Sequence, residues 1–147
     1  MTKEDAEQVE RLFAAARAAR TKAYTPYSGF PVGAAVLTES GQIHAGCNVE
    51  NAAYPAGLCA EAGALGAMVA AGETRITAVM VVGGGHGLVT PCGLCRQRIR
   101  EFAGPDTVVH VADEAGLRRS FPFAELLPFA FGPANLGLGE GHSDHDE

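Results

Sequence analysis

The chain has 147 residues, of which 47% are hydrophobic and 19% are charged, and its net charge is −6 at pH 7. This balance is typical of one compact domain with a buried core, and it excludes collagen-like, coiled-coil and disordered proteins. The acidic charge disfavours a nucleic-acid partner, and the sequence shows neither a membrane-length apolar run nor a secretory leader, so we expect a cytoplasmic protein.

The predicted elements begin with an amphipathic helix over residues 4–20, opened by a capping pair of Thr2 and Asp5. A loop separates it from a hairpin whose strands lie near residues 30–37 and 42–49. Further elements are a helix over about 59–71, a strand over 76–82, a helix over about 92–102, a strand over 107–111 and a short helix over 123–127. This alternation favours an α/β fold with helices on both faces of a sheet. Residues 1–136 are the expected domain, and residues 137–147 are an expected acidic, disordered tail.

The four cysteines are the most informative residues of the chain: Cys47, Cys59, Cys92 and Cys95. In a reducing cytosol, metal binding or catalysis is a better interpretation of them than two disulfides. Cys59 and Cys92 each open a predicted helix, where free backbone N–H groups and the helix dipole are expected to lower a thiol pKa. Cys95 follows Cys92 by about one turn, so the sequence predicts a zinc ion held by three sulfurs.

A zinc site with three protein ligands and an open fourth position is typical of a catalytic rather than a structural metal. Zinc lowers the pKa of bound water towards 7, and Glu61, two residues after Cys59, is placed to act as general acid and base. C-x-E followed by P-C-x-x-C matches the signature of zinc nucleobase deaminases, with cysteine in place of the more frequent histidine.

Other interpretations of these residues remain open. Two of the cysteines can be ordinary small core residues, and a structural zinc site is possible if a fourth ligand exists. Cys47, in a predicted strand, is expected in the core. Two histidines are weaker ligand candidates. His86 lies in a glycine-rich loop and is expected to be solvated, and His110 lies in a predicted strand and is expected to be hydrogen-bonded.

From about residue 24 to residue 136 the chain resembles the small, single-domain cytidine deaminase family. The segments that carry the resemblance are AYTPYS at 23–28, FPVGAA at 30–35, GCNVENAAY at 46–54, CAE at 59–61, PCGLCRQ at 91–97 and LLPFAFG at 126–132. The resemblance implies a three-layer α/β/α sandwich with a mixed five-stranded sheet, assembled as a homotetramer. It also implies hydrolytic deamination of cytidine and 2′-deoxycytidine to the uridines in pyrimidine salvage.

The same resemblance implies a role for each matching residue. Zinc is held by Cys59, Cys92 and Cys95, while Glu61 moves protons between water and the base. Asn48 and Glu50 are the implied contacts to the ribose, and Phe30 and the Ala60 backbone are the implied contacts to the base. Tyr54 is implied to lie near the pocket, and Phe131 is implied to enter the site of a neighbouring subunit. Residues two apart on a strand face the same side, so an amide and a carboxylate at 48 and 50 can hold neighbouring hydroxyls.

One position departs from the family pattern. Many relatives with three cysteines carry an arginine directly after the catalytic glutamate, and this chain has Ala62. Three thiolates around Zn²⁺ have a formal charge of −1, which that arginine offsets. We expect Ala62 to weaken or retune catalysis without abolishing zinc binding, with compensation from helix dipoles or another cation.

Three other functions compete with this interpretation. A related deaminase for a blasticidin-S-type nucleoside shares the metal motif but need not keep residues 48 and 50. A nucleic-acid cytosine editor needs a basic channel, which a net charge of −6 disfavours. A non-enzymatic zinc module does not explain Glu61 or an open metal position.

Overall fold

A computed structural model describes residues 2–85 and 87–138 of the chain. The elements are α1 (Lys3–Arg20), β1 (Gly33–Thr38), β2 (Ile43–Cys47), η1 (Tyr54–Ala56), α2 (Ala60–Ala70), β3 (Ile76–Val82), α3 (Gly93–Arg100), β4 (Ala103–Asp113), β5 (Gly116–Pro122), α4 (Phe123–Leu126) and η2 (Pro133–Leu136). The strands form one five-stranded sheet in the order β2-β1-β3-β4-β5. Only the β3–β4 pair is parallel among these neighbours, so the sheet is mixed.

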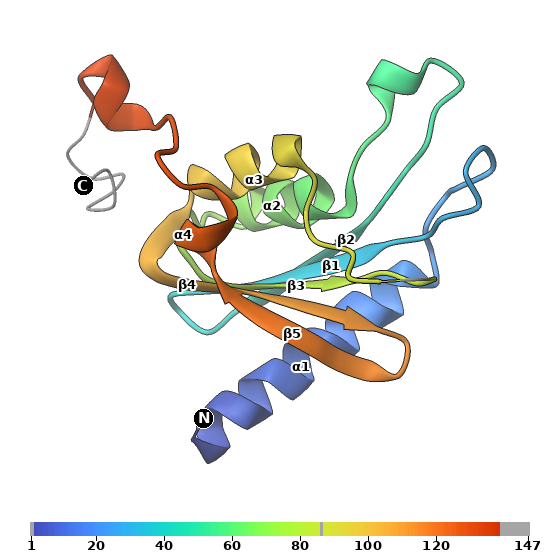
Figure 1. The fold of residues 1–147 in the computed structure, drawn as a ribbon, viewed down its shortest axis with the longest axis horizontal. Helices are drawn as coiled ribbons and strands as arrows, with labels where there is room; N and C mark the ends of the chain where they lie inside the picture. Colours follow the sequence, from blue (N-terminus) through green and yellow to red (C-terminus); the bar gives the residue numbers. More distant parts are fainter. Residues whose placement is uncertain (1, 86, 139–147) are drawn as a thin grey trace.

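The helices lie on both faces of the sheet (Figure 1), which confirms the predicted three-layer α/β/α arrangement. Helix α1 covers one face. Helices α2 and α3 lie side by side on the other, with α4 beside them over β4. The Thr2–Asp5 capping box at the start of α1 is confirmed, since each residue's side chain accepts a hydrogen bond from the other's backbone N–H at 3.1 Å.

Strand β3 separates two hydrophobic cores, as its continuous apolar sequence predicts. Val79 and Val81 point towards α2 and α3, while Met80 and Val82 point towards α1. On the α1 side, the fully buried Leu12 packs into the second core. The sheet is therefore fixed on both faces, and the starts of α2 and α3 are held on a rigid support.

Strand β5 was missed by the prediction from local sequence, and β4 is longer than the predicted 107–111. Most of β5 is exposed, and Arg118 and Arg119 face solvent on it. As the edge strand it buries no continuous apolar face, so it lacks the alternation that identifies strands. Its antiparallel pairing with β4 and the stacking of Arg119 over the Phe121 ring, at 4.5 Å, hold it in place.

Within the described residues, no helix combines the length and apolar character needed to cross a membrane. The predicted tail, residues 137–147, falls almost wholly outside the described part of the chain. Gly137 ends η2 in the left-handed conformation, with φ of 75°. In Figure 1 the segment that carries η2 extends away from the sheet on the side of α2 and α3.

Candidate metal centre and active site

The start of α2 places Cys59 and Glu61 over the end of β2. Cys59 is the N-cap, with extended backbone angles, and its carbonyl accepts from the Gly63 N–H at 3.1 Å. The helix lies unusually close to Gly46 of β2, because a Cβ at that position would come within 2.5 Å of the Ala64 nitrogen. Glycine on β2 therefore allows the first turn of α2 to settle against the sheet.

The start of α3 presents the other two cysteines. Cys92 is its N-cap, and its carbonyl accepts from the Arg96 N–H at 2.9 Å. The Arg96 guanidinium donates to the carbonyl oxygens of Pro91 and Leu126, each at 2.8 Å, and to the Thr90 hydroxyl at 3.0 Å. Arg96 thus joins α3 to the preceding loop and to α4, which fixes the position of the Cys92–Cys95 turn.

The two helix starts bring three sulfur atoms together. The Sγ atoms of Cys59, Cys92 and Cys95 all lie within 4.8 Å of one another, on half-buried, exposed and buried residues respectively. Tetrahedral zinc with bonds of about 2.3 Å places its sulfur ligands about 3.8 Å apart, so this donor set fits the ion after a small contraction. Within residues 2–85 and 87–138 this group holds no fourth cysteine, histidine or carboxylate.

The thiols differ in acidity, and the prediction that a helix start lowers a thiol pKa is correct for only one of them. Burial raises the pKa of Cys92, but hydrogen bonds from the Cys95 backbone N–H and the neighbouring thiols outweigh it, and the net pKa is lowered. Burial raises the pKa of Cys59, and burial together with the Glu61 charge raises that of Cys95. In the metal-free protein, loss of water outweighs the helix dipole at those two positions.

Glu61 is the buried carboxyl of the site. Its exposed fraction is 5%, and burial raises its pKa above the usual range, an effect that the positive charge of Arg98 reduces. A carboxyl with a raised pKa both accepts and donates protons near neutral pH. The structure therefore places a general acid–base candidate in the first turn that follows Cys59.

Asn48 and Glu50 lie just after β2, on either side of Val49, which forms isolated bridges to Tyr24 and Leu58. The Asn48 amide accepts from the Val32 N–H and donates to the Phe30 carbonyl, both at 2.9 Å. These two hydrogen bonds hold the backbone before β1 against the end of β2.

Glu50 holds an earlier part of the loop that connects α1 to β1. One oxygen of its carboxylate accepts from the Tyr27 N–H at 2.9 Å and from the Ser28 N–H at 3.1 Å. The Ser28 hydrogen bonds lower the Glu50 pKa, so this group stays ionised at neutral pH. This anchoring of the loop by residues 48 and 50 was not anticipated from the sequence.

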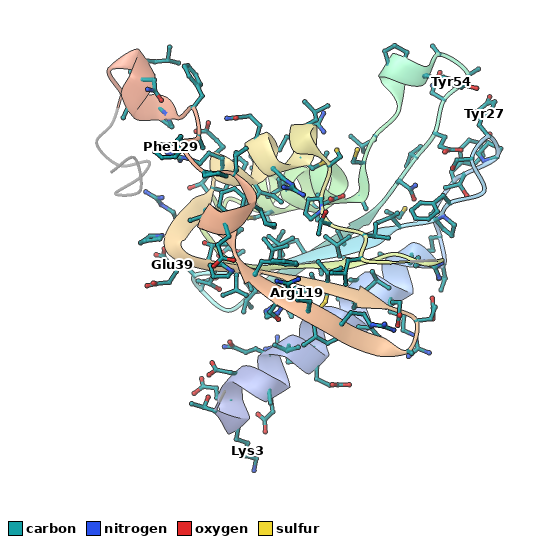
Figure 2. The ribbon with its side chains drawn as sticks, viewed as in Figure 1. Lys3, Tyr27, Glu39, Tyr54, Arg119 and Phe129 are labelled. Carbon is teal, nitrogen blue, oxygen red and sulfur yellow. The ribbon has the colours of Figure 1, made fainter. Side chains whose placement is uncertain are left out.

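A pocket of about 490 Å³ joins these residues to one of the three metal ligands, Cys59. Figure 2 shows Tyr27 and Tyr54 on neighbouring loops at one end of the molecule, and their rings meet edge-on with centroids 5.9 Å apart. The lining residues are Tyr27, Ser28, Asn48, Val49, Glu50, Asn51, Tyr54, Gly57, Leu58 and Cys59. Three of the predicted substrate contacts and one predicted metal ligand thus share one pocket.

The remaining predicted substrate contacts lie elsewhere on the protomer. Ala60 is buried behind Cys59, and Phe30 is 42% exposed outside the set of residues that line the pocket. Phe131 is also exposed, and its carbonyl accepts from the Gln97 side chain at 2.9 Å. This hydrogen bond ties the C-terminal segment to α3.

The weaker ligand candidates are not part of the sulfur cluster. Cys47, predicted in the core, is half-buried at the end of β2 and stays outside the cluster. His110 is buried in β4, and its Nδ1 lies 2.7 Å from the Ser120 hydroxyl, which agrees with the expected hydrogen-bonded histidine. His86 lies outside the described residues.

Sequence reasoning missed one charged group beside the thiols. The Arg98 guanidinium donates to the Cys95 sulfur at 3.4 Å. The signal was present in the spacing, because residues three apart on a helix share a face and Arg98 follows Cys95 by three. Compensation for Ala62 was expected from helix dipoles or from another cation, and Arg98 is a cation in contact with one of the thiols.

Comparisons with known proteins agree with this geometry. A family model described as the cytidine and deoxycytidylate deaminase zinc-binding region matches residues 6–112. The cytidine deaminase of Sporosarcina psychrophila is 44% identical over 128 residues, which cover 87% of this chain and 94% of that protein. The crystal structure of cytidine deaminase from Burkholderia pseudomallei gives a TM-score of 0.78 at 44% identity, covering 89% of this chain and 100% of that one. The crystal structure of cytidine deaminase from Mycobacterium tuberculosis gives a TM-score of 0.70 at 39% identity, and the match covers 84% of this chain and 96% of that one.

Proposed function

The chain belongs to the cytidine and deoxycytidylate deaminase family, and from this premise we propose that it hydrolytically deaminates cytidine and 2′-deoxycytidine to uridine and 2′-deoxyuridine, releasing ammonia. The observation that carries the proposal is the cluster of three cysteine sulfurs, which lie within 4.8 Å of one another. Glu61, a carboxyl that is only 5% exposed, follows the first of these cysteines, Cys59, by two residues. The similar proteins are cytidine deaminases, which favours a cytidine-type substrate over a blasticidin-S-type nucleoside. This reaction belongs to pyrimidine salvage.

The chemistry divides between the metal and the protein. Zinc held by Cys59, Cys92 and Cys95 would supply Lewis-acid chemistry, which makes water acidic enough to act as a nucleophile near neutral pH. Glu61 accepts the proton that the attacking water loses and delivers it to ring N3. The same carboxylate then takes the second proton, from the hydroxyl now on C4, and passes it to the amino nitrogen, so that ammonia leaves and a C4 carbonyl remains. Burial of Glu61, which raises its pKa, suits a group that must both take and give a proton.

Residues that line the pocket, together with Phe30 and Ala60 outside it, orient the nucleoside in this proposal. Asn48 and Glu50 hydrogen-bond the ribose hydroxyls, and both line the pocket that reaches Cys59. Phe30 packs against the base, the Ala60 backbone contacts it, and Tyr54 closes the outer side. Because Asn48 and Glu50 also hold the loop before β1, their loss should affect both sugar binding and the position of Phe30.

We further propose that the enzyme is a cytoplasmic homotetramer in which Phe131 completes the site of a neighbouring subunit. Figure 2 shows Phe129 and Tyr54 at opposite ends of the protomer, and Phe129 is fully exposed. Phe131 follows Phe129 by two residues, is exposed and does not line the pocket that reaches Cys59, so its ring is free to contact another subunit. Residues 1–136 form the catalytic domain and the remainder an acidic tail. A monomer mass by light scattering would contradict the shared site.

A direct comparison of substrates tests the reaction. The purified, zinc-loaded chain is incubated separately with cytidine, 2′-deoxycytidine, blasticidin S and a cytosine-containing oligonucleotide, and ammonia and the deaminated product are measured. The proposal expects conversion of the first two. Conversion of blasticidin S alone, or of the oligonucleotide alone, would contradict it.

A further inference from the structure

The metal centre would carry a net negative charge, and the residue that follows Glu61 on α2 supplies no positive charge to balance it. Three thiolates and one Zn²⁺ sum to −1, and the Glu61 carboxylate, which acts electrostatically on Cys95, adds further negative charge. Both Cys95 and Glu61 are at least 95% buried, so water screens this charge poorly. The residue after Glu61 is Ala62, whose side chain carries no charge.

Helix α3 supplies a cation in contact with the cluster. Arg98 lies one turn after Cys95, and its guanidinium nitrogen donates to the Cys95 sulfur at 3.4 Å. Arg98 is partly buried, and its helix runs beside α2 over the sheet (Figure 1). The same guanidinium also interacts electrostatically with Cys59, Cys92 and Glu61, so its charge acts on more than one group of the site.

We propose that Arg98 is a positioning residue of the metal centre, which hydrogen-bonds the Cys95 sulfur and brings the formal charge of the zinc–thiolate group to zero. The inference rests on the proposed zinc site. Charge-assisted hydrogen bonds to a metal ligand fix its orientation and stabilise its ionised form. Arg98 therefore does from α3 what Ala62 cannot do from α2.

The test measures zinc affinity rather than turnover. Metal-free wild type, Arg98→Gln and Arg98→Lys are titrated with zinc against a chromophoric chelator, and cobalt(II) spectra report the bonds to sulfur. Arg11→Gln, which removes one exposed charge from α1, is the matched control. Thermal melts of the metal-free variants show that each is folded.

We expect Arg98→Gln to bind zinc about 10- to 100-fold more weakly and to shift the sulfur-to-cobalt charge-transfer band. Arg98→Lys, which keeps the charge, should recover most of the affinity, and Arg11→Gln should match the wild type. Equal affinity and spectra in wild type and Arg98→Gln would overturn the role of Arg98 alone. A lysine variant as weak as the glutamine variant would overturn the charge assignment, and a wild type that binds no zinc would contradict the proposed function as well.

Discussion

Gly46 of β2 and Ala64 of α2 are in such close contact that a single added carbon atom would collide with the helix backbone. The atoms that a Gly46 Cβ would meet, at 2.5 to 2.8 Å, are the Ala64 nitrogen, the Gly63 carbonyl carbon and the Ala60 oxygen. All of them belong to the turn that carries Glu61. The geometry of the active site thus depends on a glycine that contributes no functional group.

The first prediction is that Gly46→Ala disturbs both the fold and the metal centre. Because the contacts are with backbone, α2 must shift, and we expect a loss of about 1–3 kcal/mol in the free energy of unfolding, with weaker zinc binding. Chemical denaturation and a chelator titration measure the two effects. Gly66→Ala on the same helix is the control, since its Cβ meets nothing within 4 Å and should stabilise α2 by up to about 1 kcal/mol. Similar behaviour of the two variants would refute the close-packing argument.

A second prediction concerns Glu61→Gln. The amide keeps the shape of the side chain but cannot carry a proton from water to the base, so we expect kcat to fall by about 100- to 10,000-fold. Zinc content should stay at that of the wild type, because Glu61 is not part of the sulfur cluster. Glu125→Gln, an exposed residue of α4, should leave both values unchanged. Full activity in Glu61→Gln would show that another group moves the proton.

The third prediction follows from the acidity of the thiols in the metal-free protein. The pKa values of Cys59 and Cys95 are raised, so both are protonated at neutral pH and must lose their protons when zinc binds. Zinc binding should therefore release at least about two protons, and affinity should rise about 100-fold per pH unit through the neutral range. Calorimetry in buffers of different ionisation enthalpy counts the protons. Release of fewer than one proton per zinc would mean that the thiols are already ionised.

His110 gives the fourth prediction, which concerns stability. Burial lowers the pKa of His110 below its usual 6.5, so the unfolded chain takes up a proton at this residue more readily than the folded chain does. The free energy of unfolding of the metal-free protein should therefore fall as the pH drops below about 6.5. His110→Gln, which keeps a polar partner for Ser120, should show a flatter curve between about pH 7.5 and about pH 5.5. Parallel curves for the two proteins would contradict this assignment.

The elements that carry the metal centre were predictable from local chemistry. Cysteines at two helix starts, a proline before the second, and an apolar strand between them specify which groups converge, and both N-caps are where the sequence places them. The five-stranded sheet followed only from the resemblance, because β5 is held by pairing with β4 rather than by its own pattern.

The features that could not be predicted from the sequence depend on contacts between distant segments and on the positions of long side chains. The anchoring of the 24–32 loop by Asn48 and Glu50 needs the strand ends side by side, and spacing alone indicates only a shared face. Arg98 has several rotatable bonds, so its place against Cys95 is set by the packing of α3 on α2. The acidity of Cys59 and Cys95 depends on burial, which outweighs the helix dipole that the sequence suggests.

The measurement that tests the central claim most directly is activity as a function of zinc content. Metal-free protein is titrated with zinc, and each aliquot is assayed for bound metal per chain and for loss of cytidine absorbance. We predict a rate that rises in proportion to bound zinc and stops rising at one ion per chain, since three sulfurs form a single site. Deamination by the metal-free chain, or a chain that binds zinc at this site and leaves cytidine unchanged, would contradict it.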